Sequence, residues 1–455
     1  MKKENVTRKQ KREEKDNFKA MHELIRILQK YFPGLVALLK EVQDPRNQSY
    51  ITYENQVILL TRILGTVFRI TSMRKLTEEF TETIVVNNIG ILSGIAELAE
   101  LPHYDTINNY LARLEQTELE KIIQKLVYRL LRMRTFEDSR IRNKYWQIVI
   151  DGTNTFWSNE RHCPHCLTKE HKNEDGSIKY IGYYHNALET KLVLNGVIVV
   201  SIGTEFIENE KPDVTTQDCE QNAFYRLANK LKKAFPQLPV CLGLDSLYAA
   251  APVFDLCEQF GWKYIIRFKD GSIPTVAKDF HALKFMEADQ TFTLIERAPD
   301  KDPSKDISKT YRYVNHIEYQ SHFLNLAELT IQDEKYPFVF ITNLSVSKKN
   351  CAQLIEDGRR RWKIENQGFN SQKNHGCELE HLFSHNYNAM KNHYLLIQIG
   401  HMIAQFFQHI LTIWKNINSP DYSIFEILKR DFFNALLSFQ ILDDIKSLNK
   451  RFRFK

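Results

Sequence analysis

Three acidic residues, far apart in the sequence, have the types and surroundings that suit the binding of metal ions. Asp151 and Asp245 each come directly after a short apolar run, so each is expected to end a buried strand at the carboxyl edge of a sheet. Glu365 lies in a stretch whose apolar residues have helical spacing. Carboxylate oxygens are the ligands that hard cations such as Mg²⁺ prefer. The three residues are therefore predicted to converge on one site that holds divalent metal.

Such a group of carboxylates suits the cleavage of a phosphodiester bond. The transition state is highly charged, and two Mg²⁺ ions about 4 Å apart activate water on one side of the phosphorus and stabilise the leaving oxygen on the other. Asp151 is predicted to bridge the two ions, with Asp245 and Glu365 each completing one; Mn²⁺ is expected to substitute for Mg²⁺. Arg361 stands four residues before Glu365 on the same helix face, beside two further arginines. At least one of the three arginines is expected to contact DNA phosphate.

The elements that position these acids alternate between strand and helix. Strands are predicted at 147–151, 187–194, 197–203, 240–245 and 263–268, and helices at 217–235 and 249–260. The dipeptide Asn195-Gly196 is a hairpin signal between two of the strands. This order predicts an α/β fold with a mixed sheet flanked by helices. Further along the chain, strands at 291–296, 310–319, 324–331 and 338–343 precede one helix over 359–373.

Composition changes along the chain suggest domain boundaries. The predicted divisions are a disordered charged tail (1–17), a helical DNA-binding region (18–140), a first core segment (141–270), a β-rich insertion (271–335), a second core segment with the Glu365 helix (336–391) and a helical C-terminal region (392–455). In the N-terminal region, Asp105 is predicted to cap a helix that carries Asn108, Asn109 and Arg113 on its polar side. That helix either reads base edges in DNA or is an ordinary surface helix.

The bulk composition is that of a soluble globular protein. The 455 residues carry a net charge of +6, which permits a nucleic-acid partner without requiring one. The seven cysteines do not form a disulfide pattern and no secretory leader is evident, so a cytoplasmic, nucleoid-associated protein is expected. The most apolar segment, 394–414, contains several polar residues and is predicted to be a buried helix rather than a membrane span.

A cluster of cysteines and histidines follows Asp151. It contains His162, Cys163, Cys166, His171 and, further on, His185. The Cys-x-x-Cys spacing suits zinc, with His162 and His171 as candidate partners of the two cysteines. The alternative is a polar loop near the active site that binds no metal.

Taken in order, these motifs resemble the DDE transposases of bacterial insertion sequences. The matching segments are Asp151-Gly152-Thr153, Asp245–Tyr248, Tyr264–Arg267, Thr342–Leu344 and Arg361–Glu365. The chain is similar to the subgroup that has a Tyr-Arg-Glu-Lys signature and a β insertion before the catalytic glutamate. Gly358 and Gln372 stand at the Tyr and Lys positions of that signature, and Lys373 lies one residue beyond.

The resemblance implies an RNase H-like core in which Asp151, Asp245 and Glu365 are catalytic. It implies Mg²⁺-dependent cleavage at the terminal inverted repeats of a transposon, joining of the 3′-hydroxyl ends to target DNA, and a dimer that holds two ends together. DNA contacts are expected from Arg361, Lys373, Arg360, Asn343 and Trp362. The alternatives are a catalytically inactive, domesticated DNA-binding derivative, against which the intact acid triad argues, and a nuclease that cleaves without joining.

Overall fold

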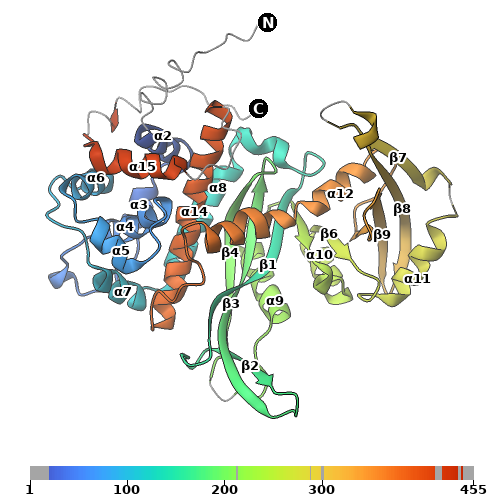
Figure 1. Ribbon diagram of the computed structural model, residues 1–455, viewed down its shortest axis with the longest axis horizontal. Coiled ribbons are helices and arrows are strands. Elements are labelled where there is room, and N and C mark those ends of the chain that lie inside the picture. The colour runs from blue at the N-terminus through green and yellow to red at the C-terminus, as the bar shows by residue number, and fades with distance from the viewer. Residues whose placement is uncertain are drawn as a thin grey trace, which may run out of the picture. The chain divides into compact units, whose positions relative to one another are not determined.

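The chain divides into two compact units, which are described separately (Figure 1). The computed structural model describes residues 20–211, 214–286, 288–298, 302–415, 423–438 and 442–443, so the predicted tail at 1–17 lies outside the described residues. Residues 133–371 form the unit that contains the sheet. Residues 1–132 and 372–455 together form the second unit, which is helical. The N- and C-terminal helical regions thus belong to one unit.

The sheet unit is built on ten strands in a mixed sheet. Their order is β2-β3-β1-β5-β6-β10-β9-β8-β7, and β4 pairs with β3. The strands are β1 (Trp146–Ser158), β2 (Leu167–Lys172), β3 (Ile178–Leu194), β4 (Ile198–Ile207), β5 (Val240–Leu244), β6 (Lys263–Phe268), β7 (Thr291–Glu296), β8 (Ile307–Tyr319), β9 (His322–Ile331) and β10 (Phe338–Thr342). The predicted mixed α/β sheet is confirmed.

Parallel pairing is confined to the centre of this sheet. β1 pairs in parallel with β5, and β5 with β6, whereas β3 and β10 pair antiparallel with their neighbours. The parallel strands are reached through α9 (Glu220–Ala234) and α10 (Ala251–Phe260), as βαβ connections require. The hairpin between β3 and β4 turns at Asn195 and Gly196, which both have positive φ, as this dipeptide predicts.

The predicted β-rich insertion continues the same sheet. β8 and β9 form a hairpin, and β9 pairs with β10 of the core, so the insertion extends one edge of the sheet. The helix α11 (Pro274–Leu283) and the short 3₁₀ turns η4 (Ala288–Gln290) and η5 (Pro303–Lys305) interrupt these strands.

Residues 154–186, here called the β-arm, lie between the strands predicted at 147–151 and 187–194 and form three antiparallel strand segments. β1 continues to Ser158, β2 pairs with the first half of β3, and together they project from the sheet (Figure 1). A β-bulge interrupts the β1–β3 pairing between Asn154 and Phe156. Because the exposed side chains of the arm are mostly polar, the apolar periodicity that predicts strands was missing here.

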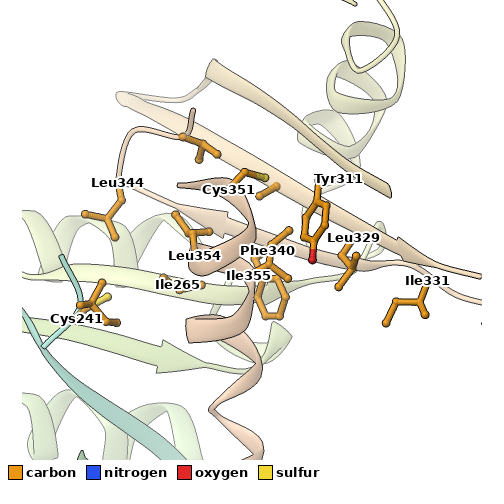
Figure 2. Packing of buried hydrophobic residues seen from close by; sticks show 13 residues of the cluster. Cys241, Ile265, Tyr311, Leu329, Ile331, Phe340, Leu344, Cys351, Leu354 and Ile355 are labelled. Carbon is orange, nitrogen blue, oxygen red and sulfur yellow. The ribbon is translucent and has the colours of Figure 1, made fainter. Parts of the chain in front are cut away.

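One hydrophobic cluster holds α12 (Cys351–Arg359) against the insertion side of the sheet (Figure 2). Its members are Ile141, Cys241, Ile265, Tyr311, Ala327, Leu329, Ile331, Phe340, Leu344, Val346, Cys351, Leu354 and Ile355. Each large aliphatic side chain buried here contributes about 1.5–3 kcal/mol. A Cβ atom at Gly358 would lie 2.7 Å from the ring of Phe340, so the end of this helix touches the sheet directly. The cluster therefore fixes where the chain leaves α12 towards Glu365.

The helical unit contains ten helices or parts of them among its described residues. They are α2 (Ala20–Tyr31), α3 (Leu35–Lys40), α4 (Asn55–Val67), α5 (Met73–Glu79), α6 (Thr83–Ser93), α7 (Tyr104–Arg113), α8 (Gln116–Leu131), the end of α13 (Asn370–Asn374), α14 (Tyr387–Lys415) and α15 (Ser423–Asn434), with a 3₁₀ turn η1 (Gln48–Tyr50). Asn388 and Asn392 of α14 both donate hydrogen bonds to the carbonyl of Leu114. These bonds connect the C-terminal part of the unit to its N-terminal part.

Two predictions for this unit have different outcomes. The apolar segment 394–414 is helical, as predicted, and it is largely buried over 394–410; no helix in the described ranges meets the length and apolarity needed to cross a membrane. The predicted cap at Asp105 is wrong, because α7 begins one residue earlier. The ring nitrogen Nδ1 of His103 accepts the hydrogen bond from the Asp105 N–H at 3.3 Å and so takes the capping role.

Candidate active site

The register of two parallel strands brings the two aspartates side by side. Trp146 lies opposite Val240 and Val149 opposite Gly243, so two residues further along each chain Asp151 is level with Asp245. Parallel strands end at the same edge of a sheet, which is where α/β proteins place their sites. Asp245 follows the last residue of β5, whereas Asp151 lies within the longer β1.

Asp245 also shapes the turn that follows it. Its carboxylate Oδ1 accepts a hydrogen bond of 2.9 Å from the backbone N–H of Leu247 and so caps the 3₁₀ turn η3 (Ser246–Tyr248). The cap restricts the side chain to an orientation near the end of β5. The Asp-Ser-Leu-Tyr segment is thereby a structural unit in which Tyr248 is buried.

Asp151 has a shifted pKa. Burial raises its pKa, and the negative charges of Asp245 and Glu365 raise it further, whereas Arg361 and the Gly152 N–H act in the opposite direction. Arg361 Nη1 lies 2.8 Å from Asp151 Oδ2. The charges of Asp245 and Glu365 thus reach Asp151, and Arg361 only partly offsets the combined effect of burial and these charges.

Glu365 lies in a π-helical segment, η6 (Ile364–Phe369), rather than in the single helix predicted over 359–373. After α12 the chain turns through i→i+3 bonds, with Arg361 N–H donating to Gly358 O at 3.2 Å. This tight turn ends the helix, and the wider π turns follow. Such segments occur frequently at functional sites.

The π-helical segment is anchored on one side only. Ile364, Gly368 and Phe369 are buried, and η6 packs against β1 and β4. Glu365 is exposed on the other side. The buried residues therefore hold the backbone on the sheet, and the charge of Glu365 raises the pKa of Asp151 in addition to the larger effect of burial.

The predicted DNA-contacting residues have different surroundings. The guanidinium group of Arg361 pairs with Asp151 and also lies over the ring of Trp362, whose side chain is 52% exposed. Arg360 pairs with Asp357 at 3.1 Å. The amide of Asn343 is engaged with the backbone of β6: it accepts from Tyr264 N–H and donates to Trp262 O.

Lys373 belongs to the helical unit. There its ammonium group lies 2.7 Å from the carboxylate of Glu380. Of the residues predicted to contact DNA, Arg361 is therefore the one that pairs with an acid of the site, Asp151. The side chain of Asn343 is instead hydrogen-bonded to the backbone beside β6.

A fourth carboxylate, which the sequence did not single out, lies beside the site. Glu220 begins α9, and Tyr248 Oη donates to its Oε1 at 2.6 Å. A Cβ atom at Gly152 would lie 2.7 Å from Glu220 Oε2, so the glycine leaves the space that this carboxylate fills. Burial raises the pKa of Glu220, Tyr248 lowers it, and the charges of Asp151 and Asp245 raise it. The only signal in the sequence is an acid at the start of a helix, which is too common to identify a site.

The cysteines of the β-arm lie beside a histidine, but not one of the two that were predicted. Cys163 Sγ and Cys166 Sγ lie 3.2 and 3.3 Å from Nε2 of His185. His162 instead stacks on Tyr183 in the exposed turn before Cys163. His171 stacks on Tyr180 across β2 and β3, with a centroid distance of 4.4 Å. His185 replaces them because the bulge in β1 and the fold of the arm bring distant positions together.

The model of the Transposase DDE domain family matches residues 142–403. The chain belongs to this family. The match includes the two aspartates, Glu365 and all ten strands of the sheet, and it confirms the predicted RNase H-like class of fold. Members of the family are transposases, which act on DNA by cutting and joining it and generally use divalent metal ions. No curated protein sequence matches the chain.

The residues of this transposase's site fit a divalent ion. The donors are carboxylate oxygens, which hard cations prefer, and the positive charge now closest to Asp151 is a guanidinium group. An additional cation would remove the like-charge repulsion that raises the pKa of Asp151.

Proposed function

We propose that this transposase cleaves DNA at the terminal inverted repeats of an insertion sequence and joins the freed 3′-hydroxyl ends to target DNA. Asp151, Asp245 and Glu365 are the proposed catalytic residues. The observation that carries the proposal is electrostatic: carboxylates from two neighbouring parallel strands and a π-helical turn act on the pKa of one of them, Asp151. An acid whose pKa is shifted by burial and by identified charged neighbours is typical of functional sites.

The three carboxylates would hold two Mg²⁺ ions, or Mn²⁺ in their place, with Asp151 shared between them. When bound, the ions would supply the activation of the nucleophile and the stabilisation of the leaving oxygen. Glu220, which accepts a hydrogen bond from Tyr248, is not proposed as a metal ligand. It is proposed to orient Asp151 and Asp245 through its charge.

Two in-line displacements account for the overall reaction. In the first, the oxygen of water attacks the phosphorus at the transposon end, and the P–O bond to the 3′ oxygen breaks, which leaves a 3′-hydroxyl and a 5′-phosphate. In the second, that 3′-hydroxyl attacks a phosphorus of the target strand, and the target's own 3′ oxygen leaves. The same carboxylates serve both steps because the two reactions differ only in the nucleophile.

Arg361 is proposed to change partners during the reaction. Without metal its guanidinium group neutralises Asp151. Cations held by Asp151 would take over this neutralisation, and the guanidinium would then be available to bind the phosphate beside the scissile bond, where its planar fork matches two phosphate oxygens. Arg360 and the exposed ring of Trp362 stand next to it in the sequence and are proposed to extend the contact to the DNA strand.

Further DNA contacts from Lys373 and Asn343 complete the proposal, although Asn343 would first give up its bonds to the backbone of β6. The assignment to the Tyr-Arg-Glu-Lys subgroup rests on Arg361 and Glu365. At the tyrosine position, Gly358 packs against Phe340 and Ile265 and leaves no space for a ring. Because two transposon ends react together, the active form is proposed to be a dimer on DNA.

The test uses the purified chain, Mg²⁺ and a DNA fragment that carries the ends of the element and its flanking DNA. The proposal expects cleavage at the ends and joined products with a target plasmid, and neither from Asp151→Asn. Cleavage without joining would indicate a nuclease. Specific binding without cleavage by both proteins would indicate an inactive DNA-binding derivative. Either result would overturn the proposed function.

A further inference from the structure

A second group of ligand atoms lies in the β-arm. It consists of Cys163 Sγ, Cys166 Sγ and His185 Nε2, which all lie within 4.8 Å of one another. Among the described residues, this is the group of cysteine, histidine or acidic ligand atoms that lies so close together. The two sulfur atoms are 3.8 Å apart, and the sulfur–nitrogen distances are 3.2 and 3.3 Å. No disulfide joins the cysteines.

These three distances match the edges of one coordination tetrahedron. With Zn–S bonds of about 2.3 Å and a Zn–N bond of about 2.0 Å, ligands at tetrahedral angles stand about 3.8 Å apart for two sulfurs and about 3.5 Å for sulfur and nitrogen. The observed sulfur–sulfur distance agrees, and the sulfur–nitrogen distances are within about 0.3 Å. Two thiolates and an imidazole also form a donor set that favours zinc over the hard cations that carboxylates bind.

The group is held in place by contacts that do not involve the ligand atoms. The Cys163–Cys166 turn is closed by a backbone bond from Cys166 N–H to Cys163 O at 3.2 Å. Asn209, which is buried, donates its side-chain amide to Cys166 O at 3.0 Å and its backbone N–H to His165 O at 3.2 Å. These bonds tie the turn to the chain that follows β4.

His185 is placed by the bulge in β1. Thr155, the residue at the bulge, donates its hydroxyl to the His185 carbonyl at 3.1 Å. His185 is 2% exposed and Cys166 is 5% exposed, so both lie in the base of the arm rather than on its surface. The half-buried Cys163, the buried Cys166 and the buried His185 thus bring their ligand atoms close together from a turn and a strand.

We propose that Cys163, Cys166 and His185 bind one Zn²⁺ ion, with water in the fourth position. The ion would cross-link the turn at the start of β2 to β3 and so fix the base of the β-arm. The arm carries exposed Lys169, Lys172 and Lys179 among exposed acidic residues, and Lys172 pairs with Glu170 at 3.5 Å. The metal site does not depend on the proposed function.

The test measures zinc in the whole purified chain by mass spectrometry of the metal, after removal of loosely bound ions by gel filtration. About one zinc per chain is expected for the unchanged protein. Cys163→Ser, Cys166→Ser and His185→Ala are each expected to lose most of it. Cys219→Ser and His162→Ala serve as matched controls, because Cys219 is exposed and neither residue belongs to the group. Both controls are expected to keep their zinc.

A second measurement does not depend on the variants folding. Unchanged protein stripped of metal and loaded with Co²⁺ is expected to show thiolate-to-cobalt charge transfer and the strong visible bands of a tetrahedral site. Failure to bind Zn²⁺ or Co²⁺, equal loss of zinc in Cys219→Ser, or a mass two daltons low from a Cys163–Cys166 disulfide would each overturn the proposal. Zinc content is measured without DNA, so its outcome is separate from that of the cleavage test.

Discussion

The two candidate metal sites of the sheet unit differ in how far they are assembled before any ion binds. In the β-arm, two sulfurs and a ring nitrogen already lie within 4.8 Å of one another. The carboxylates do not form such a compact group within the described residues, and an arginine lies on Asp151. The difference is expected from the ligand types: a thiol can donate a hydrogen bond to a neighbouring ligand atom, as Cys166 Sγ does to Cys163 Sγ, whereas ionised carboxylates repel.

The comparison suggests two kinds of site in one unit. A preassembled, buried group of soft ligands suits a permanent structural ion, since the protein does not need to move to bind it. An open group of hard ligands, with its charge provisionally balanced by Arg361, suits ions that act together with a charged substrate.

The largest expected effect is on catalysis. Asp151→Asn is expected to lower DNA cleavage by at least about a thousandfold, because it removes the shared ligand of both ions, a loss of about 4 kcal/mol in transition-state stabilisation. Zinc content and DNA binding are expected to stay at the level of the unchanged protein. Asp279→Asn, an exposed acid on α11, is the matched control. Loss of zinc in Asp151→Asn would show that the two sites are not independent.

Glu220→Gln tests the fourth carboxylate. Removal of a group that orients metal ligands typically costs about 10–100-fold in metal affinity or activity. The expected result is a higher Mg²⁺ concentration for half-maximal cleavage, with a smaller change at saturating Mg²⁺. Tyr248→Phe, which removes the hydrogen bond to Glu220 but keeps the carboxylate, is expected to show the same change to a lesser degree. An unchanged Mg²⁺ dependence in both variants would leave Glu220 with a purely structural role.

The central part of the fold could be predicted because apolar runs encode it directly. Val240–Leu244 and Lys263–Phe268 are short, apolar and bounded by breakers, and the structure places strands at both. Asn195-Gly196 marked its hairpin because few other residues adopt positive φ twice in succession. The two aspartates could be paired for the same reason, since both follow runs of this kind.

The remaining parts depend on contacts between positions that no local pattern connects. The β-arm is held by cross-strand contacts such as the stacking of His171 on Tyr180, not by an apolar face. The π-helical segment at Glu365 comes after Gly358, which packs on Phe340, and no local pattern in the sequence marks either feature. His185 comes to the cysteines through a bulge, 19 residues after Cys166, and histidines nearer in sequence were the more obvious candidates.

Removal of zinc is expected to loosen the β-arm alone. If the ion cross-links the Cys163–Cys166 turn to β3, its removal by a strong chelator frees the base of the arm to open locally. Cleavage by trypsin at Lys169, Lys172 and Lys179 is then expected to be about tenfold faster, which corresponds to about 1.4 kcal/mol in the opening equilibrium. The same chelator should have no effect on Cys166→Ser. An arm that is cut equally fast with and without zinc would contradict a structural role for the ion.

The smallest expected effect concerns stability and has the opposite sign to the effect on activity. Asp245 raises the pKa values of both Asp151 and Glu220, so its charge opposes ionisation of its neighbours in the metal-free protein. Asp245→Asn keeps an oxygen that can accept the Leu247 N–H and removes the repulsion. In EDTA, the free energy of unfolding of the sheet unit is therefore expected to rise by about 0.5–1 kcal/mol, while cleavage is lost.

Denaturant unfolding at neutral pH measures the change. Repetition at pH 3, where Asp151 and Glu220 are mostly protonated because their pKa values are raised, should abolish the difference, because the gain comes from charge. A loss of stability at neutral pH would mean that the Asp245 carboxylate stabilises the metal-free fold, and the comparison between an open, repulsive site and a preassembled one would fail.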